Sequence, residues 1–255
     1  MMYAQAVKSV SVPTQSILFN IDIEGPLTKD KTAVLRVFAK MFYNHCGFYG
    51  DDLKIAKLER FIEKQGKTQQ FREAFEKVNG APWTETRDSF AFFEDDIVSV
   101  LQSTLGMSEQ AARNWFNGEE TNELSIAQLV ADIQEYVDGK GKDFRLLFMV
   151  DEVGQYIGDD GDLMINLQSL VEEIGIRCHG KVWVMVTSQE AIDSVVHITG
   201  NDFSKIQGRF NTRLSLSSSS VDEVIKKRVL AKTDAADQLL RMVYDKEHAV
   251  LKNLY

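Results

Sequence analysis

Two short apolar runs constrain the fold of this chain more than any other feature. Residues 144–150 read FRLLFMV and residues 182–186 read VWVMV, and polar residues follow each run directly. Runs of this kind, with little polar alternation, are typical of strands buried on both faces of a parallel sheet. Residues 163–174 lie between them and have the apolar spacing of a helix. Strand, helix and strand in this order predict an α/β fold with helices on both faces of the sheet.

The same type of pattern continues on both sides of this pair. Further strands are expected at residues 16–22 and 213–216, and further helices at residues 31–43, 221–232 and 235–253. These segments predict an α/β core formed by residues 1–50 and 131–220. Residues 221–255 would then be C-terminal helices that begin a lid or a linker.

The stretch from residue 51 to residue 130 has a different composition. It is rich in Glu, Lys, Gln, Ala, Leu and Phe and has no strand pattern. Its apolar spacing predicts amphipathic helices at residues 53–65, 69–78, 90–105, 108–116 and 125–137. Ser108 and Ser125 are expected to cap two of these helices. We therefore expect a helical insertion between the two parts of the α/β core.

The composition narrows the class of protein. The chain of 255 residues has a net charge of -9, which argues against a broad nucleic-acid-binding surface. It has no apolar stretch of about 18 residues, so we expect no membrane span. Its two cysteines, Cys46 and Cys178, fit no disulfide framework, and residues 1–12 lack the pattern of a secretory signal. These features favour a cytoplasmic protein.

Asp151 and Glu152 follow the apolar run at residues 146–150 directly, which is the Walker B pattern of P-loop ATPases. Ligands bind at the carboxyl ends of strands in open α/β sheets. There, an aspartate helps to hold Mg²⁺ through water, and a following glutamate can orient the attacking water. We therefore assign metal binding to Asp151 and catalysis to Glu152. The alternative is a strand that simply ends in a charged turn.

Three polar residues, Thr187, Ser188 and Gln189, follow the run at residues 182–186. In P-loop ATPases of the AAA+ and related classes, the strand after Walker B ends in a polar residue that senses the γ-phosphate. We expect one of these side chains to reach the attacking water or the phosphate. The alternative is an ordinary strand-to-helix turn in which Ser188 is an N-cap.

Two arginines, Arg209 and Arg213, precede the expected last strand. A guanidinium in this place suits an arginine finger, which stabilises charge that develops on a phosphate, often across a subunit boundary. The alternative is a structural or solvated arginine pair. Together with other basic residues between positions 205 and 228, they also leave a local contact with DNA open.

The chain has no glycine-rich phosphate-binding loop of the form G-x-x-x-x-G-K-[ST]. The nearest match is Gly66-Lys67-Thr68, but Phe61 stands where the first glycine is needed, and a helical pattern precedes the segment. Residues 4–10 have the place of the helix that follows such a loop. We therefore expect an unfilled slot in the sheet, and we expect this chain alone to bind no ATP and to be inactive.

Several blocks resemble the large P-loop protein of bacteriophage-exclusion (BREX) defence systems, the BrxC/PglY type. They are FMVDEVGQYIG (148–158), LQSLVEE (167–173), KVWVMVTSQEA (181–191), DFSKIQGRF (202–210) and the segments 16–22 and 246–254. The resemblance implies a much longer bacterial, cytoplasmic protein with an N-terminal AAA-like ATPase domain, of which this chain is an internal part. It implies ATP and Mg²⁺ as cofactors of that protein.

The resemblance also implies a role in restricting phage DNA, in a complex with the methyltransferase and other subunits of the system. AAA-like proteins often form rings or stacks, so self-association is expected as well. By motif, Asp151 and Glu152 would be the Walker B pair, and Ser188 or Gln189 the sensor. A second hypothesis from another class is a non-catalytic scaffold, in which the α/β core is degenerate and the helices of residues 51–130 bind a partner protein.

Overall fold

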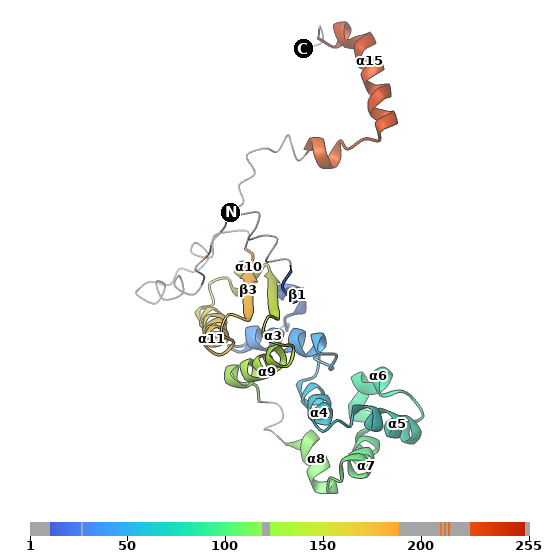
Figure 1. Cartoon of the computed structure of the whole chain (residues 1–255), viewed down its shortest axis with the longest axis vertical. Coiled ribbons are helices and arrows are strands. Elements are labelled where there is room, and N and C mark those ends of the chain that lie inside the picture. Colours follow the sequence, from blue (N-terminus) through green and yellow to red (C-terminus); the bar gives the residue numbers. More distant parts are fainter. Residues whose placement is uncertain are drawn as a thin grey trace. The chain divides into compact units, whose positions relative to one another are not determined.

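The computed structural model describes residues 11–26, 28–118, 123–188, 210, 212, 214 and 225–252. The chain forms two compact units, Met1–Phe210 and Asn211–Tyr255, each of which is described by itself. The first unit contains a parallel sheet and most of the helices (Figure 1). The second contains the long helix α15.

The sheet has three parallel strands in the order β1 (Thr14–Asn20), β2 (Arg145–Asp151) and β3 (Val182–Val186). In the register of the sheet, Asn20 lies opposite Asp151, and Val150 lies opposite Val186. The three strands therefore end at the same edge. The predicted α/β class and the predicted strands at residues 144–150 and 182–186 are confirmed.

One face of the sheet is covered by α3 (Ala33–His45), α9 (Ile126–Gly139) and α11 (Gly161–Arg177). Alternate strand residues such as Phe19 and Phe148 point into this core, and the Phe38 ring of α3 lies 5.5 Å and 5.4 Å from their ring centroids. Each buried side chain of this size contributes about 1.5–3 kcal/mol to folding. This packing holds the ends of β1 and β2 side by side.

In the described residues no helix covers the opposite face of the sheet, so the expected helices on both faces stay a prediction. Leu18, Trp183 and Met185 on this face are 69%, 61% and 49% exposed. The reason is the handedness of the connections. Because β1, β2 and β3 succeed one another in one direction across the sheet, right-handed crossovers place all their connecting helices on the same face.

The helices between α3 and α9 form a hydrophobic core of their own, in which the Trp83 ring packs edge-on against Phe71 and Phe75. The predicted helix at residues 90–105 is divided at Phe93 into a 3₁₀ helix and α7. The helices of this core are α4 (Leu53–Lys64), α5 (Thr68–Asn79), α6 (Trp83–Thr86), η1 (Arg87–Phe92), α7 (Glu94–Leu105) and α8 (Glu109–Asn117).

The predicted caps are confirmed. Ser108 accepts a hydrogen bond from the backbone N–H of Ala111 at the start of α8, at 3.2 Å. Ser125 does the same for Gln128 at the start of α9, at 3.1 Å. Each cap satisfies a backbone donor that the first turn of a helix leaves without a partner.

A buried ion pair joins the helical core to the sheet core. Arg60 of α4 lies 2.8 Å from the carboxylate of Asp132 of α9, which is 4% exposed. The hydroxyl of Tyr43 and the amide of Gln128 donate to the same carboxylate at 2.8 Å and 2.9 Å. Helix α9 thus packs in the sheet core, although the predicted boundary at residue 130 falls within it. The predicted domain division itself stays a prediction.

Apart from Thr212 and Leu214, the second unit is described from Ile225 to Lys252. It has a π-helical turn, η3 (Ile225–Val229), and helix α15 (Asp234–Lys252), which confirms the predicted helix at residues 235–253 up to Lys252. Of the predicted strand at residues 213–216, only Leu214 lies within the described residues. In the described part of the chain, no helix is both long enough and apolar enough to cross a membrane.

Candidate functional site

Five polar or charged residues meet where the three strands end: Asn20 at the end of β1, Asp151 and Glu152 at the end of β2, and Thr187 and Ser188 after β3. The parallel register brings them to one edge, as the sequence predicts for the last four. The strand ladder continues past β3, because Thr187 N–H donates to Val150 O at 2.9 Å. This backbone bond fixes the tip of β3 beside the tip of β2.

Asp151 is an exposed carboxylate held by its neighbours. Its Oδ1 accepts a hydrogen bond from the Thr187 hydroxyl and one from the backbone N–H of Glu152, at 3.1 Å. No described residue donates to Oδ2. One carboxylate oxygen is therefore fixed by the protein, and the other is available to a ligand.

Glu152 has a strained backbone. Its φ of 61° and ψ of 29° place it in the left-handed region, which costs a non-glycine residue about 1–2 kcal/mol. Its carboxylate Oε2 accepts a hydrogen bond from Asn20 Nδ2 at 2.6 Å, and its N–H lies 3.2 Å from the Thr187 hydroxyl. Strain of this kind persists only where surrounding contacts determine it, and it is concentrated at functional sites.

Asn20 is the residue that sequence reasoning missed. Its Oδ1 accepts hydrogen bonds from the N–H groups of Asp22 and Ile23, at 2.9 Å and 3.2 Å, and so caps α2 (Ile21–Glu24). The predicted strand at residues 16–22 therefore ends two residues early. The available signal was the position of Asn20, a polar residue closing an apolar run like Asp151 and Thr187. A single amide thus connects α2 with Glu152.

Gly154 and Ser188 are in very close contact. Helix α10 (Val153–Ile157) begins directly after Glu152, and a Cβ atom added to Gly154 would lie only 2.0 Å from Ser188 Oγ. Ser188 Oγ is buried, and no described residue forms a hydrogen bond with it. Only glycine fits here, so the close approach of α10 to the tip of β3 depends on Gly154, which sequence reasoning also missed.

Tyr156 and Lys29 fix the far side of α10. Lys29 Nζ donates to the backbone oxygen of Tyr156 at 2.8 Å and lies 4.0 Å from the centroid of its ring. Burial raises the pKa of the Tyr156 phenol. This packing connects α10 to the loop that follows α2.

The remaining predicted site residues are Gln189, Arg209 and Arg213, and all three lie outside the described residues. Their assignment stays a prediction. Gly66-Lys67-Thr68 lies in the turn from α4 to α5, and no strand precedes it, as expected for a chance match. Within the described part of the chain, β3 pairs with β2 alone, so its outer edge carries no further strand.

A magnesium ion fits this edge only together with other ligands. Among the described residues, no group of three or more His, Cys, Asp or Glu side chains is arranged to hold a metal. Mg²⁺ in nucleotide sites keeps several waters and takes one or two carboxylates besides the phosphates. Asp151 has one oxygen fixed by the protein and one available, so it suits the role of a single carboxylate ligand.

No protein-family model matches this chain, and no solved structure matches it. The geometry of the strand ends is therefore the observation that bears on function.

Proposed function

We propose that this chain is the Walker B part of a P-loop ATPase core, similar to the ATPase domain of the large P-loop protein of BREX defence systems. The observation that carries the proposal is the pair Asp151 and Glu152 at the end of the central strand β2, held on either side by Thr187 and Asn20. An ordinary charged turn explains neither the left-handed backbone of Glu152 nor its bond to Asn20.

In this proposal, each residue at the edge has a separate role. Asp151 would bind Mg²⁺ through water, and its Thr187 bond keeps the carboxylate in place. Glu152 would accept a proton from the attacking water, and Asn20 positions its carboxylate. Mg²⁺, when bound with ATP, neutralises charge on the β- and γ-phosphates. Ser188 or Gln189, which follow β3, would sense the nucleotide.

The phosphate-binding loop would have to come from outside the printed sequence. The outer edge of β3 is the place where another parallel strand can pair within the described sheet. Such a strand would end beside Thr187 and Ser188, and a loop following it would face Asp151. We therefore expect this chain to bind nucleotide only when that strand and loop are present.

The cellular role follows from the resemblance alone. We propose that the complete bacterial protein acts in the cytoplasm, in ATP-dependent restriction of phage DNA with the methyltransferase and other BREX subunits. Self-association and a direct DNA contact are further proposals.

A scaffold function is the second candidate. The open apolar face with Leu18, Trp183 and Met185 is the observation that favours it, because exposed apolar patches mark interaction sites.

The test is calorimetric titration with MgATP of this chain and of a chain extended at its N-terminus by a strand and a phosphate-binding loop. The proposal predicts binding by the extended chain alone, weakened by Asp151→Ala in the presence of Mg²⁺. Absence of binding by the extended chain, with its folding verified by circular dichroism, would favour the scaffold.

A further inference from the structure

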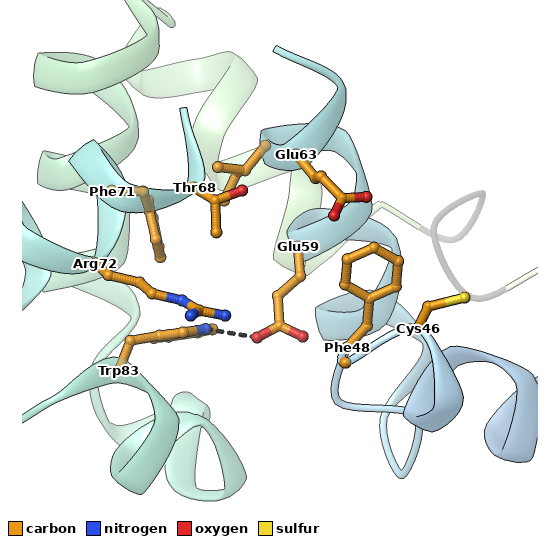
Figure 2. A pocket seen from close by; sticks show the side chains of 10 residues that line it. Cys46, Phe48, Glu59, Glu63, Thr68, Phe71, Arg72 and Trp83 are labelled. Atoms are coloured by element: carbon orange, nitrogen blue, oxygen red, sulfur yellow. Dashed lines mark hydrogen bonds between the residues drawn. The ribbon is translucent and has the colours of Figure 1, made fainter. Parts of the chain in front are cut away.

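A small pocket lies between α4 and α5, away from the strand ends. It has a volume of about 120 Å³. Its walls include the rings of Phe48, Phe71 and Trp83, and three charged side chains, Glu59, Glu63 and Arg72, line it as well (Figure 2). Phe48 belongs to the sheet core, whereas Phe71 and Trp83 belong to the helical core. An occupant of this pocket would therefore contact both cores.

Arg72 is the unusual member of this set. Its Nε is buried, and no described residue accepts a hydrogen bond from it or forms an ion pair with it. Figure 2 shows its side chain reaching from α5 into the pocket beside Trp83. A buried N–H without an acceptor is unfavourable. A ligand that offers an oxygen to Arg72 would remove this penalty.

Glu59, one of the two carboxylates that line the pocket, already accepts hydrogen bonds from other groups. It accepts hydrogen bonds from Trp83 Nε1 at 2.7 Å and from Arg87 Nη1 at 3.0 Å. Its other oxygen accepts from the backbone N–H of Tyr49 at 2.5 Å. Glu59 thus fixes the Trp83 wall of the pocket and leaves Arg72 without a partner.

Glu63 supplies the complementary group. Its carboxylate is exposed at the pocket and makes no hydrogen bond or ion pair with any described residue. Arg87, which does not line the pocket, is paired with Glu59, so the charges of Arg72 and Glu63 remain at the pocket and balance each other. A neutral ligand with both an acceptor and a donor fits this arrangement better than an ion.

A peptide group has this chemistry, since its C=O accepts and its N–H donates. The size of the pocket adds a second restriction. An apolar cavity of about 150 Å³ holds a benzene molecule, so the smaller volume here suits one aliphatic side chain.

We propose that the pocket binds a leucine-like residue of a partner polypeptide, with the aliphatic side chain against the aromatic walls. A backbone carbonyl of the partner accepts from Arg72, and a backbone N–H donates to Glu63. The proposal rests on no residue of the strand-end site, so it stands independently of nucleotide binding.

The test uses N-acetyl-L-leucinamide as the probe and the Trp83 indole N–H resonance of the ¹⁵N-labelled chain as the readout. Trp115 and Trp183, whose indoles donate to Lys54 O and Gly180 O, are internal controls. We expect a saturable shift at Trp83 alone. N-acetylglycinamide, which lacks the side chain, should give no such shift, and N-acetyl-L-leucine, an anion, should bind more weakly.

Two variants test the role of Arg72. Arg72→Leu should weaken binding by about tenfold or more, the typical loss for a hydrogen bond to a charged group, and Arg72→Lys should weaken it less. Arg113 on α8 is paired with Asp95 and Glu109. Its variant Arg113→Leu is the matched control and should leave the affinity for the probe unchanged. Preferential binding of the anion, unchanged affinity in both Arg72 variants, or no shift at Trp83 would overturn the proposal.

Discussion

The buried carboxylates of this protein contrast with those at the strand ends. Asp132 and Glu59, 4% and 7% exposed, are each paired with an arginine and with further donors from other elements. Asp151 and Glu152 instead bond to neutral groups, the hydroxyl of Thr187 and the amide of Asn20. Neutral partners orient a carboxylate without cancelling its charge. Burial and ion pairing therefore mark the structural carboxylates, and a fixed geometry without a cationic partner marks the candidate catalytic ones.

The largest expected effect concerns the buried pair. Arg60→Met leaves Asp132 buried without its cation, and we expect a loss of about 3 kcal/mol in the free energy of unfolding. Urea denaturation measures it. Arg113→Met removes an arginine from solvent-screened ion pairs and should cost far less. Equal losses in the two variants would remove the distinction between buried and exposed carboxylates.

Gly154→Ala tests the packing beneath the strand ends. Its Cβ would collide with Ser188 Oγ, so we expect destabilisation by about 1–3 kcal/mol. Gly139→Ala, at a helical position with no atom near the new Cβ, should stabilise the protein by about 0.5–1 kcal/mol. Thermal denaturation compares them. Adding Ser188→Gly to Gly154→Ala should restore most of the loss, and failure to do so would exclude this collision as the cause.

The strain at Glu152 gives a smaller effect. Glu152→Ala and Glu152→Gly both remove the carboxylate, but only alanine keeps a Cβ in the left-handed region. We expect the glycine variant to be more stable by about 1 kcal/mol. Denaturant titration of the two variants measures the difference. An alanine variant of equal or higher stability would show that Glu152 is unstrained.

The smallest expected effect concerns the thiols of Cys46 and Cys178, which extend the comparison to buried groups without a charged partner. Burial raises the pKa of the Cys46 thiol to about 12 and that of Cys178 to about 11, above the ordinary value of 9.0. The neutral thiols favour folding below pH 9, and this stability is lost as the pH rises through the folded values. Both thiols should react slowly with a disulfide reagent at pH 8. Reaction as fast as in the unfolded chain would contradict their burial.

Much of the local structure could be predicted from the sequence. The strands β2 and β3 could be predicted from their apolar runs. The caps of Ser108 and Ser125 could be predicted because each bonds to a residue three positions further along the chain. The boundaries of helices and strands were harder to predict where a side chain sets them. Asn20, for example, ends β1 by capping α2. These features depend on residues close together in the chain.

The site was only partly predictable, for a physical reason. Asp151, Glu152, Thr187 and Ser188 follow apolar runs, and strand ends are visible in a sequence. The bond from Asn20 to Glu152 spans 132 residues, and the contact of Gly154 with Ser188 depends on how α10 packs. Apolar composition indicates which strand residues can be buried, and the path of the chain decides which of them are.

The most direct test of the central claim is the rate of ATP hydrolysis by the N-terminally extended chain and by its Glu152→Gln variant. If Glu152 is the base that Asn20 positions, the variant should bind MgATP as tightly as the unchanged chain but hydrolyse it at least about 100-fold more slowly. Undiminished hydrolysis by the variant would contradict this role and would leave Asp151 and Glu152 as an ordinary strand end.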